Sequence, residues 1–219
     1  MTQLTAPDHQ AQNNLDIFPA REAHTNELRA GLRPSQETIE EGYRNILAFA
    51  GEDPDREGLL RTPHRAAEAF KYLTSGYSQD VETLLNGAVF REDYDDMVVV
   101  KDIEFYSLCE HHLLPFVGQA HVAYLPDKRI LGLSKLARIV ERYSRALQVQ
   151  ERMTQQVATW LQDELVPRGV GVVLEAEHMC MSVRGVRTPG AKTVTSALRG
   201  RLRDDARTRG EFLDLVRRR

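Results

Sequence analysis

Hydrophobic positions repeat with a helical period in two stretches of the N-terminal third of the chain. The first, SQETIEEGYRNILAFAG (35–51), has Ser35 placed as an N-cap, acidic residues in its first turn and a closing glycine. In the second, RTPHRAAEAFKYL (61–73), Thr62 is a good N-cap and Pro63 stands at the first helical position, where its missing N–H costs nothing. Both stretches are predicted to be helices.

The middle of the chain changes to a strand pattern. Residues 96–108, DMVVVKDIEFYSL, and residues 118–126, GQAHVAYLP, are rich in β-branched and aromatic residues, which predicts two strands. Two helical patterns follow, with apolar residues three or four positions apart at Leu133, Leu136, Ile139, Val140 and Tyr143, and then at Met153, Val157, Trp160 and Leu161. Residues 169–185, GVGVVLEAEHMCMSVRG, return to a strand pattern, with 191–200, AKTVTSALRG, as a partner. A charged helix ending in EFLDLVRRR closes the chain.

This order of elements predicts an α+β fold: helices, two strands, two helices, two strands and a final helix. Residues 1–34 are rich in Gln, Asn, Ala and Pro without an apolar period, and we expect them to form a flexible N-terminal arm. The first helices define an N-terminal helical region at residues 35–95. The strands and later helices define a domain at residues 96–219.

Composition narrows the classes of function. The 219 residues include 42% hydrophobic residues, enough for a core. The 29 Lys and Arg against 32 Asp and Glu give a net charge of −3, so no overall basic field exists to hold a nucleic-acid polymer or an anionic membrane. No segment approaches the ~20 apolar residues of a membrane span, and a signal-peptide pattern is absent from the sequence. We therefore expect a cytoplasmic protein whose anion sites, if any, are local.

The two cysteines indicate a metal site. Cys109 and His112 in SLCEHHLLPF are three residues apart, so that one turn could aim both at one ion; alone, this pair is also compatible with a buried thiol beside an ordinary histidine. In EAEHMCMSVRG the strand period of two places four side chains on one face: His178, Cys180, Ser182 and Arg184. Cys109, His112 and Cys180 would balance the charge of Zn²⁺ and leave one position open, as in catalytic zinc sites.

Two further histidines stand beside these ligands. His111 and His178 are not needed for coordination, and each could act as a general acid or base near neutral pH. The alternative for either is an ordinary histidine that only supports the ligands or the core.

Charged residues near predicted helix starts are candidates for ligand binding. In LGLSKLARI, Ser134 and Lys135 fall at a helix N-terminus and Arg138 in its first turn, where backbone N–H groups attract anions; a helix cap and a solvated face are the simpler explanation. Arg184 adds a cation to the face that carries His178. Glu151 in QVQERMT suits the first turn of a helix, and it could also accept two hydrogen bonds from a guanine-like edge.

Several spaced motifs together resemble one enzyme family. SLCEHHLLPF, GLSKLARIV, QVQERMTQQ and HMCMSVRGVR, with TPHRAA and KTVTSALRG, are similar to type I GTP cyclohydrolase over residues 36–217. The resemblance implies that the domain at 96–219 is catalytic. The implied reaction opens the imidazole ring of GTP, releases C8 as formate and yields 7,8-dihydroneopterin triphosphate, the first step of folate and tetrahydropterin biosynthesis.

The resemblance also implies a role for each matching residue. Cys109, His112 and Cys180 become the ligands of one zinc per subunit, and His111 and His178 the groups that transfer protons. Glu151 holds the guanine edge, with Gln150 and Ser134 near the base or ribose. The triphosphate is expected to meet four cationic side chains: Lys135, Arg138, Arg184 and Arg65.

The implied architecture is the tunnelling fold, a ββααββ unit with an antiparallel sheet and helices on one face. Such units join edge to edge into a barrel, so we expect a homodecamer of two pentamers with active sites between subunits. Joining also covers sheet edges that a single chain leaves open. Gln119 departs from the family pattern, in which a basic residue is expected.

Two other functions remain possible from the sequence. A relative on the same fold could act on a pterin or a similar purine-like ring, although the phosphate-binding cations argue against this. A non-catalytic assembly module stabilised by zinc would need a closed site with four ligands and would leave His111 and His178 without a role.

Overall fold

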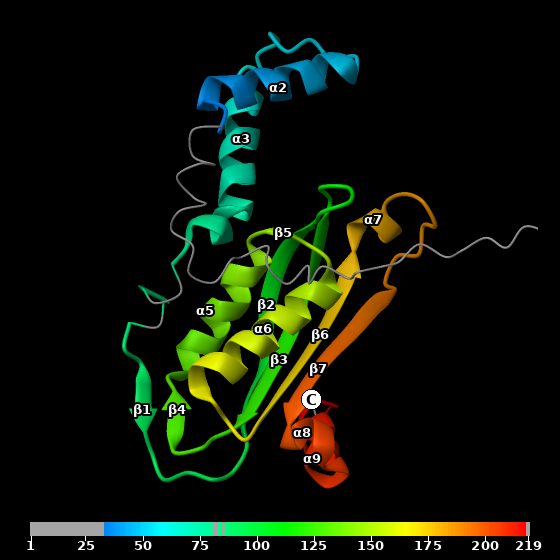
Figure 1. The fold of residues 1–219 in the computed structure, drawn as a ribbon. Helices are drawn as coiled ribbons and strands as arrows, with labels where there is room; N and C mark the ends of the chain where they lie inside the picture. Colours follow the sequence, from blue (N-terminus) through cyan, green and yellow to red (C-terminus); the bar gives the residue numbers. More distant parts are fainter. Residues whose placement is uncertain (1–32, 81–82, 85, 218–219) are drawn as a thin grey trace, which may run out of the picture. The chain divides into compact units, whose positions relative to one another are not determined.

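The structure, a computed structural model, describes residues 33–80, 83–84 and 86–217 (Figure 1). The flexible arm predicted for residues 1–34 falls almost entirely outside the described residues. The proposed division between residues 35–95 and 96–219 stays a prediction.

The first two helices form where the sequence predicts them. Helix α2 spans Gln36–Phe49, and the Thr38 N–H donates to Ser35 Oγ at 3.3 Å, which confirms the N-cap. Helix α3 spans Thr62–Leu73 and has Pro63 in its first turn, as predicted. The prediction of Thr62 as N-cap is wrong, because Arg61 holds that position and its carbonyl accepts from Arg65 N–H at 3.1 Å.

A five-stranded sheet forms the centre of the chain, in the order β5-β2-β3-β6-β7. Its strands are β2 (Val98–Cys109), β3 (Pro115–Leu125), β5 (Leu147–Gln148), β6 (Gly169–His178) and β7 (Lys192–Gly200). All neighbours are antiparallel except β5, which runs parallel to β2. The four long strands are those predicted. Strand β5 and the separate pair of β1 (Val89–Arg91) and β4 (Arg129–Leu131) are too short to give a pattern.

The predicted strand over residues 169–185 is too long. Strand β6 ends at His178, and the chain turns into the short helix α7 (Met179–Ser182). The last pair with β3 is Phe116 with His178, and the residue preceding Phe116 is Pro115, which has no N–H to extend the ladder. His178 and Cys180 therefore do not share a strand face.

Helices pack against both faces of the sheet. Helices α5 (Leu133–Ser144) and α6 (Gln150–Leu165) cover one face, giving the predicted order of two strands, two helices and two strands. Helices α8 (Arg201–Asp204) and α9 (Ala206–Arg217) pack through Leu202 and Phe212 against Ala123, Leu125 and Val173. These three strand residues have odd numbers, and the side chains at odd positions point to the face opposite α5 and α6. The sequence did not predict this second layer.

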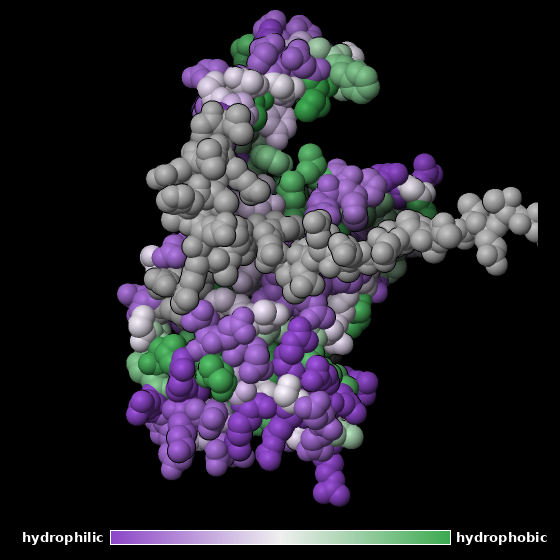
Figure 2. Space-filling model, in the orientation of Figure 1, coloured by the Kyte–Doolittle hydropathy of each residue, from purple (hydrophilic) through white to green (hydrophobic). Residues whose placement is uncertain are grey.

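The helices α2 and α3 expose apolar side chains. Phe49 is 93% exposed, Ile46 59% and Tyr72 58%, and Figure 2 shows hydrophobic side chains at the surface of this end of the chain. Among the described residues, α2 buries none of its side chains. The described ranges also contain no helix with the length and apolar character of a membrane span.

Candidate metal centre and active site

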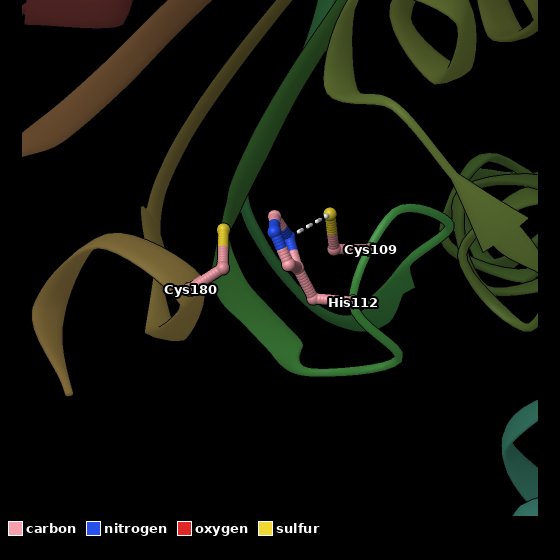
Figure 3. A group of neighbouring side chains, drawn as sticks. All are labelled: Cys109, His112 and Cys180. Atoms are coloured by element: carbon pink, nitrogen blue, oxygen red, sulfur yellow. Dashed lines mark hydrogen bonds between the residues drawn. The ribbon is translucent and has the colours of Figure 1, made fainter. Parts of the chain in front are cut away.

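Two thiols and one imidazole meet at the end of the sheet (Figure 3). Cys109 is the last residue of β2, His112 lies in the turn that follows, and Cys180 belongs to α7. Their candidate ligand atoms all lie within 4.8 Å of one another. The turn closes because His112 N–H and Leu113 N–H donate to the Cys109 carbonyl at 3.3 and 2.8 Å. The structure thus brings the three predicted ligands together.

The chemistry of this donor set suits a divalent metal ion. Burial raises the pKa of the Cys180 thiol, and the neighbouring Cys109 raises it further. A bound dication would reverse this effect and favour the thiolates. Among the described residues, no fourth His, Cys, Asp or Glu joins the group. Three ligands leave a position for another molecule, which is the pattern of catalytic rather than structural sites.

His178 lies at the end of β6, two residues before the ligand Cys180. Its ring stacks on Phe116 with a centroid distance of 4.6 Å and an interplanar angle of 2°. Its Nε2 lies 2.8 Å from Gln150 Oε1. Burial lowers the pKa of His178, and the charge of Glu151 partly opposes this shift. The imidazole is therefore held in place and favoured in its neutral form.

His111 is far more exposed than His178. Its side chain is 64% exposed, with Nε2 3.8 Å from Glu110 Oε1 and Nδ1 3.9 Å from Cys109 Sγ. Glu110 forms an ion pair with Arg152 of α6. This pair ties the turn that carries the ligands to α6. This ion pair was not predicted from the sequence, although Glu110 stands within CEHH and Arg152 directly follows Glu151.

Two predicted substrate-binding residues lie near the metal group. Glu151 is exposed in the first turn of α6 and acts on the pKa of His178. Arg184 is exposed in the turn after α7 and its charge acts on the pKa of Cys180. The structure therefore places one carboxylate close to His178 and one guanidinium close to the candidate ligand Cys180.

Four other predicted substrate-binding residues are not joined to this group by the hydrogen bonds or ion pairs of the described residues. Ser134 and Arg138 are exposed on α5, and Gly132 rather than Ser134 holds the N-cap position. Lys135 is only 8% exposed, and its Nζ donates to the Leu84 carbonyl at 2.8 Å. Arg65 is exposed on α3. Within one chain, these side chains do not complete the site.

Gln150 lies in the interior rather than at a surface. Gln150 is only 1% exposed. Its side-chain amide forms hydrogen bonds with groups on β6 and β7, and its oxygen lies beside His178. The predicted contact of Gln150 with the base or ribose stays a prediction.

Glu177 is a functional candidate that the sequence analysis did not find. Its Oε1 accepts from Ser182 Oγ at 2.6 Å and from Gly190 N–H at 3.0 Å, and these bonds lower its pKa. Residues 182–190 include Arg184, so Glu177 holds both ends of the segment that presents this cation. Because the two partners lie 5 and 13 residues away, only the folded chain reveals the contact.

Fold and site together define a class of protein: an α+β chain with a group of three side chains able to hold a metal ion and a fixed imidazole beside it. Comparison with known proteins narrows this class. The family model of GTP cyclohydrolase I matches residues 39–217. The chain therefore belongs to the GTP cyclohydrolase I family of enzymes.

Individual relatives agree with the family model. A GTP cyclohydrolase 1 of Gloeobacter violaceus is 56% identical over 188 residues, which cover 86% of this chain and 86% of the relative. The GTP cyclohydrolase 1 of Homo sapiens is 58% identical over 80% of this chain and 70% of its own length. A Synechococcus relative of the same name is 60% identical over 78% of this chain and 75% of its own length.

Proposed function

We propose that this chain is a zinc-dependent GTP cyclohydrolase I that hydrolyses GTP to 7,8-dihydroneopterin triphosphate and formate in the cytoplasm. Family membership supports GTP as the substrate. The observation that carries the chemistry is the group of Cys109, His112 and Cys180, with ligand atoms within 4.8 Å of one another and His178 close in sequence. This reaction would be the first step of folate and tetrahydropterin biosynthesis.

Cys109, His112 and Cys180 would hold the zinc ion. Two thiolates balance its charge, and the imidazole of His112 completes the set of three protein ligands. When bound, zinc supplies a Lewis acid that lowers the pKa of water enough to make hydroxide available at neutral pH. The ion pair of Glu110 with Arg152 keeps the ligand-bearing turn against α6.

His178 and His111 would transfer the protons of the reaction. The lowered pKa of His178 keeps its imidazole neutral near pH 7, so that it can accept a proton and then return it. The more exposed His111 can exchange protons with solvent. Protons are needed at N7 when the ring opens, and again in the second hydrolysis that releases formate.

Glu151 would recognise guanine through its exposed carboxylate. The carboxylate accepts two hydrogen bonds, and guanine offers N1–H and the N2 amino group side by side. Adenine has neither donor at these positions and would be rejected. Ser134 and Gln150 are proposed near the base or ribose. The triphosphate would meet Arg184, Arg138, Lys135 and Arg65, because several cations match its charge.

A neighbouring subunit would complete the site in a homodecamer of two pentamers. Strand β7 is the last strand of the sheet, and β5 covers β2 only at Leu108 and Cys109, so both edges can take another strand. Arg65 and Arg138 are exposed and separate from the metal group within one chain. Residues of one subunit could therefore reach the ligand group of the next.

Incubation with GTP tests this function. The product, once oxidised, is a fluorescent pterin, and formate should appear in equal amount. ATP serves as the matched control, since Glu151 should not accept it. Turnover of a pterin without turnover of GTP would instead support the relative that acts on a pterin ring. Absence of turnover in the zinc-loaded protein with every purine and pterin tried would support an assembly module.

A further inference from the structure

The orientation of the buried Gln150 amide is fixed by groups that can only accept hydrogen bonds. Its Nε2 donates to the Leu174 carbonyl of β6 at 3.1 Å and to the Thr193 carbonyl of β7 at 2.9 Å. Thr195 Oγ1 lies 3.1 Å from the same nitrogen. Rotating the amide by half a turn would set its oxygen against two carbonyl oxygens in a site that is 1% exposed, which is strongly unfavourable.

The amide oxygen therefore has one possible direction, toward His178. Gln150 Oε1 lies 2.8 Å from His178 Nε2, and an amide oxygen can only accept a hydrogen bond. His178 Nε2 must then carry a hydrogen. In the neutral ring, Nδ1 is consequently the nitrogen without one, and it keeps its lone pair.

The plane of the ring is fixed as well. Phe116 stacks against His178 with an interplanar angle of 2°, and its strand pairs directly with His178 in the sheet. The stacking and the hydrogen bond together leave the imidazole one position, one plane and one tautomer.

We propose that Gln150 is a positioning residue, which selects the Nε2–H tautomer of His178 and reserves Nδ1 for proton transfer. The catalytic consequence rests on the proposed function, whereas the tautomer does not depend on it. Gln150 would then affect the chemical step through His178.

The first test compares Gln150→Leu with Thr195→Val. The leucine removes the bond to His178, while the valine removes one partner of Gln150 Nε2 and leaves the Oε1 bond in place. Because general acid–base help is worth about 10²- to 10⁴-fold, Gln150→Leu should lower kcat at least about tenfold. Thr195→Val should keep kcat within about twofold of wild type. Equal effects of the two variants would overturn the proposal.

A double variant separates positioning from general stability. If Gln150 acts only through His178, Gln150→Leu should lower kcat in the wild type and cause no further loss in His178→Asn. Additive losses in kcat would show that Gln150 acts by another route, and the proposal would be wrong.

Nitrogen NMR of the zinc-loaded wild type reads the tautomer directly. The seven histidines are labelled with ¹⁵N, and the spectrum of His178→Asn identifies the signals of His178. We expect a protonated Nε2 and an unprotonated Nδ1. A protonated Nδ1 with a bare Nε2 would overturn the proposal even if Gln150→Leu does not fold. If the NMR spectrum shows the expected tautomer but the protein does not turn over GTP, the proposed function is wrong and the tautomer assignment is still correct.

Discussion

At the scale of single residues, the candidate metal ligands differ in position from the histidines beside them. Cys109, His112 and Cys180 present ligand atoms within 4.8 Å of one another, whereas His111 and His178 stand beside this group. Substitutions should therefore fall into two sets, one that removes the metal and one that keeps it.

Replacing a ligand should remove both metal and activity. We expect the purified protein to hold about one zinc per chain, and Cys109→Ser, His112→Ala or Cys180→Ser to lose it, because each change leaves only two of the three protein ligands. Metal analysis by mass spectrometry measures this directly. His64→Ala is a matched control, since His64 lies on α3 and pairs with Glu40. Full zinc content in Cys180→Ser would contradict the assignment.

Replacing His111 or His178 by Asn should preserve zinc and impair chemistry. Loss of a general acid or base should lower kcat by about 10²- to 10⁴-fold, with a smaller effect on substrate binding. A histidine needed only for formate release should let a formylated, ring-opened intermediate accumulate, which chromatography would detect. If both variants keep near wild-type kcat, the two imidazoles have no role in proton transfer.

At the scale of elements, the segment after β6 depends on one carboxylate. Glu177 accepts from Ser182 and Gly190, and the segment between them carries exposed Arg184 and Arg187. Glu177→Ala should loosen this segment and speed tryptic cleavage after these arginines. Glu175→Ala is the control, since Glu175 lies on the same strand and pairs with Lys192 instead. Equal cleavage rates in the two variants would show that the bonds of Glu177 do not hold the segment.

The hydrogen bonds of Glu177 should make the stability of this segment depend on pH. Hydrogen bonds from Ser182 and Gly190 lower the folded pKa of Glu177 below 4.5. A lowered folded pKa means that the contact stabilises the folded segment above pH 4.5 and is lost as the pH falls through the folded value. Hydrogen exchange at the Gly190 N–H should show decreasing protection at acid pH in the wild type. A protection factor independent of pH across this range would refute the role.

The packing of α8 and α9 on the sheet needs a glycine on β6. A Cβ at Gly171 would lie 2.7 Å from Leu202 Cδ2 and 2.8 Å from Phe212 Cε1. Gly171→Ala should therefore lower the free energy of unfolding by about 1–3 kcal/mol, measured in denaturant. Gly210→Ala on α9 is the control, because no heavy atom lies within 4 Å of the added Cβ, and it should leave stability unchanged or higher. Equal stability of the two variants would contradict this packing.

At the scale of the whole molecule, the described residues of one chain leave open sheet edges and exposed apolar side chains that favour association. The edges of the sheet are available, and α2 and α3 expose Ile46, Phe49 and Tyr72. Covering them favours association of identical chains. We expect a large homo-oligomer of about ten chains, the homodecamer of two pentamers proposed above. Light scattering that gives a mass near the 24.9 kDa of one chain would refute it.

Periodicity in the sequence determined the main elements. Strands β2 and β6 follow from runs of β-branched residues, and helices α5 and α6 follow from a repeat of apolar residues. Both patterns reflect local conformational preferences, so they can be recognised in the sequence. The turn that joins Cys109 to His112 is equally local. The prediction of Cys109 and His112 as ligands relied on this short spacing, whereas Cys180 came from a separate segment; the structure brings the three side chains together.

Tertiary structure decided how the site is held. Cys180 reaches the group from α7 because β6 stops opposite Phe116, next to a proline that cannot continue the ladder. Gln150 meets His178 across 28 residues of sequence, and Arg152 meets Glu110 across 42. Such pairs depend on strand register and helix placement, which a linear pattern does not encode. The sequence alone therefore determined which residues could do the chemistry, and only the folded chain decided which residues hold them in place.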